Sequence, residues 1–332
     1  MDRSLGTRDS LGRRLLQFTG TAWLVLSLNF LLPRLMPGNP LMHLDDPQAM
    51  PKPLTAEQRE RLMAYYGLDR PLGEQYATYM TSLGRGDLGW SIRYSAPVWS
   101  VLLGRLRWTL LLVGVATALF VSLGIVLGGL SAWYRGTWLD GLLLTICGLG
   151  QSLPAFLVAM LLIRLFVVDL GWLPMGGARS GLHALLGPLE ATVDVLRHAA
   201  LPVVALVVTG VGQVYYLARN SALQTLGEGY LAVARSKGLG TRLLLFRHAM
   251  PNALLPVLHL VAMRLGALVM GAVIIESAFS YPGIGSAIVE ASIHRDYPLL
   301  QGAFAIVMLS VMGANLAADG LQRLLDPRLR RA

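Results

Sequence analysis

Two residues that are charged at pH 7 occur in one long apolar run, where a charge is costly to bury. Arg264 lies about ten residues into the run 253–279, which is roughly 15 Å deep at the 1.5 Å rise per residue of a helix. Glu276 lies near the outer end of that run, where we expect its carboxylate to reach interfacial water. Ionisable groups inside apolar spans often mark functional sites. Arg264 and Glu276 are therefore candidates for lining a polar pathway.

Two interpretations of Arg264 stay open. A guanidinium cannot escape desolvation by losing its proton, so Arg264 must pair with protein groups or face water. As a structural residue it would hydrogen-bond between helices. As a pathway residue it would attract the carboxylate of a solute.

Motifs of enzymatic chemistry are absent from the sequence. There is no phosphate-binding G-x-x-x-x-G-K-[ST], no H-E-x-x-H and no G-x-S-x-G in a strand–helix context. The six histidines are scattered, with no pair at metal-ligand spacing, and the single cysteine, Cys147, excludes an internal disulfide. We therefore expect no catalytic residue, no metal site and no cofactor in this chain.

The composition is that of a membrane protein. Hydrophobic residues make up 54% of the chain and charged residues 14%, whereas soluble domains carry about 25% charged residues. The net charge of +9 could suggest a nucleic-acid partner. The basic residues lie between apolar runs and not along one soluble face, so we exclude nucleic acid and expect a lipid bilayer as the partner.

Six apolar runs are each long enough to cross a bilayer, which takes about 20 residues. They cover residues 15–36, 108–133, 139–168, 198–217, 253–279 and 299–321. The first run follows several arginines, as a signal peptide does, but it is too long for one and we expect a retained helix. The sequence predicts an all-α integral membrane protein with about six transmembrane helices.

Charges in the loops predict the orientation. With the N-terminus inside, the cytoplasmic segments 1–14, 134–139, 219–248 and 322–332 hold 14 basic and 4 acidic residues. The external segments 37–98, 169–195 and 280–298 then hold 8 basic and 12 acidic residues. Because basic loops stay in the cytoplasm, we expect both termini inside.

The predicted organisation is uneven. Residues 1–98 form an N-terminal transmembrane helix and a long external segment, and residues 99–332 form a five-helix core. The external segment 55–83 has helical character, with Thr55 as N-cap and Gln58 three residues later. A cytoplasmic insertion, at about 219–255, interrupts the core.

This insertion carries the most informative pattern. Ala232, Ala234 and Ser236 precede Gly238, which predicts a short helix suited to close contact and ended by glycine. Basic residues at positions 235, 237, 242 and 247 suit a cytoplasmic face.

The insertion resembles the "EAA" loop of binding-protein-dependent ABC importers, because Met250-Pro251 follows Gly238 at the spacing of that motif. More narrowly, Y-x3-A-R-x-K-G-L from Tyr230, followed by R-H-x(3)-N-A-L-L-P from Arg247, resembles the first permease subunit of dipeptide, oligopeptide and nickel importers. Blocks at 67–72, 86–91, 276–285, 295–298 and 325–328 resemble those of the same family, in the same order.

Several positions depart from the family pattern. Ala232 stands where the general motif has glutamate, Asn39 where an aspartate is expected, and Tyr281 where a tryptophan is expected. Arg264 replaces an uncharged polar residue, which bears on the substrate.

The resemblance implies a type I ABC importer permease in the cytoplasmic (inner) membrane of a bacterium. Its expected partners are a homologous second permease subunit, two ATPase subunits that bind ATP and Mg, and an external solute-binding protein. The residues expected to couple to an ATPase subunit are Tyr230, Ala232, Ala234, Arg235, Lys237, Gly238, Arg247, His248, Pro251 and Asn252.

Alternatives concern both the class of protein and the solute. A gradient-driven secondary transporter would show inverted repeats and paired acids near the midplane, and neither is found. A membrane scaffold without transport would leave the insertion unexplained. Peptides are the favoured solutes, but nickel or metal–metallophore complexes, opines, glutathione and oligosaccharides use importers of the same kind.

Overall fold

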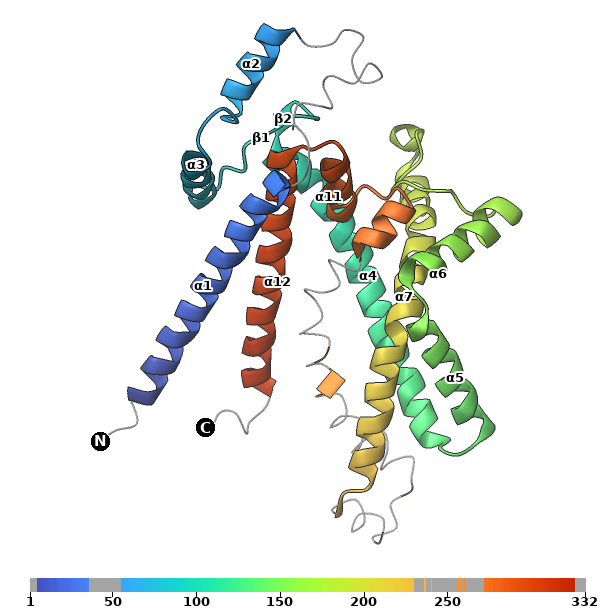
Figure 1. Ribbon diagram of the computed structural model, residues 1–332. Helices are drawn as coiled ribbons and strands as arrows, with labels where there is room; N and C mark the ends of the chain where they lie inside the picture. Colours follow the sequence, from blue (N-terminus) through green and yellow to red (C-terminus); the bar gives the residue numbers. More distant parts are fainter. Residues whose placement is uncertain are drawn as a thin grey trace. The chain divides into compact units, whose positions relative to one another are not determined.

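A computed structural model describes residues 5–35, 55–229 and 272–325, together with the single positions 236, 240, 256, 257 and 260. These residues are mostly helical (Figure 1). They divide into two compact units. The N-terminal unit comprises Met1–Gly104 and Ala287–Met308, and the core unit comprises Arg105–Ser286 and Leu309–Ala332. The segment 287–308 thus groups with the N-terminal residues, although it follows the core in sequence.

The N-terminal unit combines one long helix with several short elements. Its elements are α1 (Leu5–Leu35), α2 (Ala56–Tyr65), α3 (Leu72–Gly84), β1 (Trp90–Ser91), β2 (Ala96–Pro97), the first turns of α4 (Val98–Trp133), most of α11 (Ile284–Ile293) and the start of α12 (Tyr297–Leu325). The strands pair antiparallel, with Trp90 opposite Pro97. The helix α1 covers nearly all of 15–36, the range of the expected first span.

The predicted cap of the external segment is confirmed. The backbone N–H of Gln58 donates to Thr55 Oγ1 at 3.2 Å, and the backbone N–H of Thr55 donates to Gln58 Oε1 at 3.0 Å. This reciprocal pair satisfies two donors at the start of α2.

Asp296 holds the N-terminal unit together. Its carboxylate is buried and accepts hydrogen bonds from the Ser91 hydroxyl, from the backbone N–H of Arg93 at 3.0 Å and from that of Leu299 at 3.1 Å. It caps α12 and fixes the β1–β2 hairpin at once. Gly302 lets the start of α4 approach α12, because a Cβ at Gly302 would lie 2.6 Å from Val98 Cγ1.

The core unit contains the remaining apolar helices. After α4 come α5 (Trp138–Ser152), α6 (Ala155–Leu162), a π-helical stretch (Ile163–Asp169), a short 3-10 turn (His183–Leu185) and α7 (Pro188–Leu226). In the described residues, α4, α7 and the first 20 residues of α12 are long and apolar enough to cross a membrane, and α5 with α6 is a fourth candidate if the pair is one span. Most of the expected fifth span, 253–279, lies outside the described residues.

The predicted span 139–168 is broken, contrary to our expectation of one continuous helix. The axes of α5 and the following segment differ by 101°. Proline disfavours the helical conformation in the residue before it and removes a backbone donor. Accordingly, Leu153, before Pro154, is extended at φ −77° and ψ 132°.

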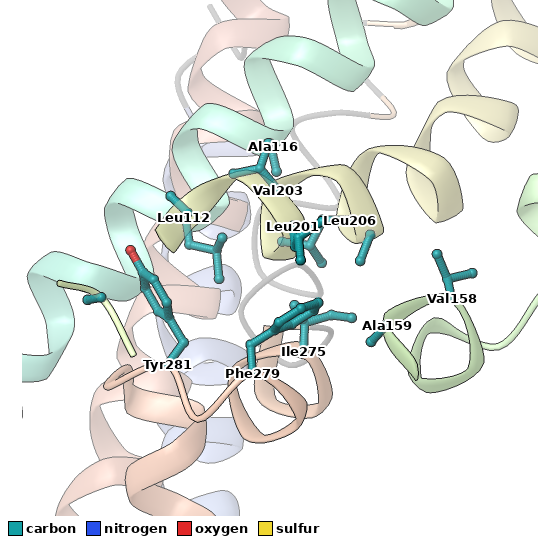
Figure 2. Packing of buried hydrophobic residues seen from close by; sticks show 13 residues of the cluster. Leu112, Ala116, Val158, Ala159, Leu201, Val203, Leu206, Ile275, Phe279 and Tyr281 are labelled. Atoms are coloured by element: carbon teal, nitrogen blue, oxygen red, sulfur yellow. The ribbon is translucent and has the colours of Figure 1, made fainter. Parts of the chain in front are cut away.

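The packing of α7 against its neighbours makes the core. Figure 2 shows Ile275 and Phe279 next to Leu201 and Leu206 of α7, in a buried cluster that also includes Leu112 of α4. Glycines bring α4 close to α7, since a Cβ at Gly128 would lie 2.8 Å from the Tyr215 carbonyl oxygen. At 39 residues, α7 is about 58 Å long, which exceeds the thickness of a bilayer with its headgroups, about 45 Å.

The orientation can be tested with two single cysteines. Between Glu74 and Thr137 the chain passes through one apolar helix, α4. In a Cys147→Ala background, Glu74→Cys should react with a membrane-impermeant maleimide from outside intact cells. Thr137→Cys should react only after the cells are opened. Labelling of both from the same side would contradict the assignment of α4 as a span.

Candidate functional site

The residues expected to contact an ATPase subunit lie outside the described residues, as does Arg264. Their roles therefore stay predictions. What the structure describes is the approach to the insertion: α7 runs to Leu226 and ends at Gly227, whose N–H donates to the Gln224 carbonyl oxygen at 3.0 Å. Residues 219–226, expected in a cytoplasmic loop, are thus the last turns of a long helix.

Glu276 is buried completely, so the expectation that it reaches interfacial water is wrong. Its carboxylate accepts hydrogen bonds from Thr109 Oγ1 at 2.6 Å and from the backbone N–H groups of Gly285 and Ser286 at 2.7 and 3.2 Å. The two N–H groups belong to the first turn of α11, where the helix dipole favours an anion. In this conformation a solute cannot touch the carboxylate, and Glu276 joins α4 to α11.

The block 276–285 owes its glycines to this carboxylate. A Cβ at Gly283 would overlap the Glu276 carboxyl group, and a Cβ at Gly285 would overlap the backbone of Val273. Thr109 completes the arrangement, because its hydroxyl also accepts the Ile284 N–H at 2.8 Å. Glu276, Thr109 and the backbone of residues 284–286 thus form one hydrogen-bonded unit, which we call the latch.

Tyr281 packs beside this latch. Its ring meets that of Trp108 edge-on at 6.1 Å between centroids, and no described residue hydrogen-bonds to its buried hydroxyl. Burial, with a further contribution from Glu276, raises the pKa of Tyr281 to about 12. The phenol therefore stays neutral in its apolar surroundings.

A second buried cluster, which sequence reasoning missed, links α4, α5 and α7. Arg219 donates from Nη2 to Asp140 Oδ2 at 2.8 Å and from Nε to Asp140 Oδ1 at 2.9 Å. Ser131 donates to the same carboxylate and also hydrogen-bonds to the Tyr215 hydroxyl at 2.8 Å. The Gly136 N–H, in the turn between α4 and α5, adds a further donor at 3.0 Å.

This cluster lies near the end of α7 that leads into the insertion. Arg219 lies seven residues before the end of α7, on the helix that leads into the insertion. A bidentate, buried guanidinium–carboxylate pair is strong and directional. It fixes this end of α7 to the α4–α5 corner. The signal that could have revealed it is Asp140 itself, a lone acid at the start of an apolar run.

Two histidines that appear unrelated in the sequence meet at one carboxylate. Asp194 Oδ2 lies 2.9 Å from His183 Nδ1 and accepts the Ser180 N–H at 2.9 Å, while His198 Nδ1 lies 3.3 Å from Asp194 Oδ1. The contacts hold the loop before α7 against that helix. Within the described ranges, no group of three or more His, Cys, Asp or Glu could hold a metal ion.

The latch can be tested by replacing Thr109 with valine. Thr109→Val removes a donor to Glu276 and an acceptor for Ile284, and should cost about 1–3 kcal/mol, the range for leaving buried polar groups unpaired. Thr117→Val is the matched control on the same helix, because the buried Thr117 hydroxyl has no hydrogen-bond partner among the residues that the structure describes. Buried Cys147 reports unfolding through its reaction with a maleimide dye on heating. Equal midpoints for the two variants would contradict the latch.

The Asp140–Arg219 ion pair predicts how the stabilities of a single and a double variant should differ. Arg219→Met leaves the buried carboxylate of Asp140 without its cation and should destabilise the core by about 3–5 kcal/mol. The double variant Arg219→Met with Asp140→Asn removes the uncompensated charge and should recover much of that loss. The same Cys147 assay measures both. A double variant no more stable than Arg219→Met alone would contradict the inference that Arg219 compensates the buried charge of Asp140.

Comparison with known proteins identifies the family. Residues 124–331 match the family described as "Binding-protein-dependent transport system inner membrane component". The chain is 34% identical to the dipeptide transport system permease protein DppB of Alkalihalophilus pseudofirmus, over 91% of this chain and 93% of the relative. It is 34% identical to the di/tripeptide transport system permease protein DppB of Pseudomonas aeruginosa, over 96% and 98%.

A third relative and a solved structure extend the comparison. The glutathione transport system permease protein GsiC of Escherichia coli is 33% identical over 96% of this chain and 97% of its own. The fold resembles that of the inward-facing MetNI methionine ABC transporter, with a TM-score of 0.55 and 17% identity over 68% of this chain and 96% of that chain. The chain therefore belongs to the family of binding-protein-dependent transport system inner membrane components, and is a multi-pass permease subunit of an ABC importer.

Proposed function

We propose that this chain forms half of the solute pathway of an ATP-driven importer of short peptides in the inner membrane of a bacterium. The observation that carries the solute class is the 34% identity, over nearly the whole length, to permeases named for dipeptide and di/tripeptide transport. Glutathione, named for a relative at 33% identity, is itself a tripeptide-like solute. Short peptides are thus the class that these names share.

The partners in this proposal are a homologous second permease subunit, two ATPase subunits and an external solute-binding protein. The sequence has no phosphate-binding loop of its own, so ATP and Mg belong to the ATPase subunits. Membership of a binding-protein-dependent family supports the external partner.

Coupling is assigned to the part of the insertion that follows α7 and, within it, to the contact residues from Tyr230 to Asn252. Movement of a rigid element between two discrete positions transmits a conformational change. The Asp140–Arg219 pair supports this assignment, because it ties the helix that leads into the insertion to the α4–α5 corner. A displacement of the insertion would then move α4, α5 and α7 together.

The proposal predicts ATP-driven peptide uptake. The complex should be reconstituted into proteoliposomes with ATP inside and the binding protein outside, and uptake of radiolabelled alanyl-alanine measured. Uptake should require both ATP and the binding protein. Gly238→Val should lower uptake while the Cys147 unfolding midpoint stays unchanged, because the sequence predicts that Gly238 ends a helix and a β-branched residue fits poorly at such a position.

Two outcomes would overturn parts of this proposal. Uptake by the purified chain alone, driven by an ion gradient and without ATP, would make it a secondary transporter. Parental uptake by Gly238→Val at parental protein levels would remove the coupling role from this segment.

A further inference from the structure

The N-terminal unit contains a cavity on its external elements that the proposed transport cycle does not use. Its volume is about 180 Å³, larger than the roughly 150 Å³ cavity that holds a benzene molecule in another protein. The walls come from the end of α1, the α2–α3 turn, α3, the turn before β1 and the start of α12, all within the same compact unit.

Arg34 places a cation on one wall of this cavity. The guanidinium lies 3.6 Å from the centroid of the Phe30 ring and donates to the Phe30 carbonyl oxygen at 2.9 Å. Its Nε and Nη2 donate to the amide oxygen of Gln75 at 3.1 and 2.9 Å. Neutral acceptors thus hold the group in place, and in the described part of the chain no carboxylate neutralises it. Each terminal nitrogen carries a second N–H for another acceptor.

Asp87 places an anion on another wall of the same cavity. Its Oδ1 accepts the Gly89 N–H at 2.9 Å, which orients the carboxylate, and Oδ2 accepts no hydrogen bond from the described residues. A second arginine, Arg70, also lines the cavity, and the other polar groups of the lining are neutral. Tyr79, for example, accepts a hydrogen bond from Asn29 at 3.1 Å, and its burial raises the pKa of the phenol, so its proton remains available for donation.

We propose that this cavity binds a small zwitterion of the amino-acid or dipeptide class, with its carboxylate on Arg34 and its ammonium group on Asp87. A guanidinium with open N–H groups recognises a carboxylate through charge-assisted hydrogen bonds. A phosphatidylethanolamine headgroup also carries an anion and an ammonium group, so the test below includes retention of a phospholipid through Arg34 as an outcome against the inference. The choice of dipeptide rests on the proposed function, and the site would retain solute at the external elements of this chain.

The test measures direct binding, without added binding protein, to the permease and its copurifying subunits in lipid nanodiscs. Isothermal titration calorimetry would compare three probes: alanyl-alanine, N-acetyl-alanyl-alanine, which lacks the ammonium, and alanyl-alanine amide, which lacks the carboxylate. Arg34→Gln should weaken binding of the first two by about tenfold or more, the loss expected for a charge-assisted pair. It should leave the amide unaffected.

Asp87→Asn gives the complementary result and keeps the Oδ1 acceptor. It should weaken alanyl-alanine and the amide while sparing the N-acetyl compound. Arg61→Gln is the matched control, because it removes one external cation that lies outside the cavity and pairs with exposed Glu57. This control should bind all three probes as the parent does.

Three results would overturn the inference. They are the absence of saturable alanyl-alanine binding, equal affinities in the parent and Arg34→Gln, and a phospholipid retained through Arg34, seen by native mass spectrometry, with no dipeptide binding. ATP-driven uptake with no direct binding would remove this site and leave the proposed function intact. Direct binding without any uptake would instead count against the proposed function.

Discussion

A bilayer offers no hydrogen-bond partners, so a carboxylate buried in a membrane protein needs donors from the protein itself. Three carboxylates are buried in the described part of the chain: those of Asp140, Glu276 and Asp296. Each is met by backbone N–H groups of a helix start or a turn. Each also binds a side chain that is distant in the sequence: Arg219, Thr109 and Ser91, respectively. The tertiary connections of both units depend on this requirement.

Close helix contacts complement these polar links. In the absence of a hydrophobic driving force between spans, small residues let helices pack tightly. Gly124 and Gly128 of α4 serve this purpose against α7, as does Gly212 of α7 against α5. The result is a rigid group of helices around α7, whose far end leads into the insertion. In the proposed coupling, the insertion would move this group as one body, whereas a loosely packed helix would absorb the displacement.

The break at Leu153–Pro154 has a different character. It divides an apolar run into two helices bent by 101°. The second helix then passes into a π-helical stretch, Ile163–Asp169, a geometry often found at functional sites. The loop that follows returns to α7, where Asp194 binds it through His183 and Ser180. Irregular backbone in a membrane protein is tolerated where protein groups satisfy it, and the Asp194 carboxylate satisfies one such group, the Ser180 N–H.

The sequence by itself determined that the chain is a helical membrane protein of this importer family. Hydropathy predicts the spans because a long apolar run has its lowest free energy in the hydrocarbon core of the bilayer. The sequence blocks around Gly238 and Glu276, in their order, indicate the family. The cap at Thr55 was also predictable, since it depends on residues three positions apart. The interpretation of Glu276 failed because depth along a helix does not reveal which turn folds over a side chain.

Only the tertiary structure decided the pairing of residues far apart. Asp140 and Arg219 are separated by 79 positions. In the sequence, each residue taken alone indicates only a charge near a membrane surface. His183, Asp194 and His198 similarly become neighbours only when the loop folds against α7. Hydropathy reports the transfer energy of each segment singly, whereas ion pairs, latches and the cavity beside Arg34 arise from contacts between segments.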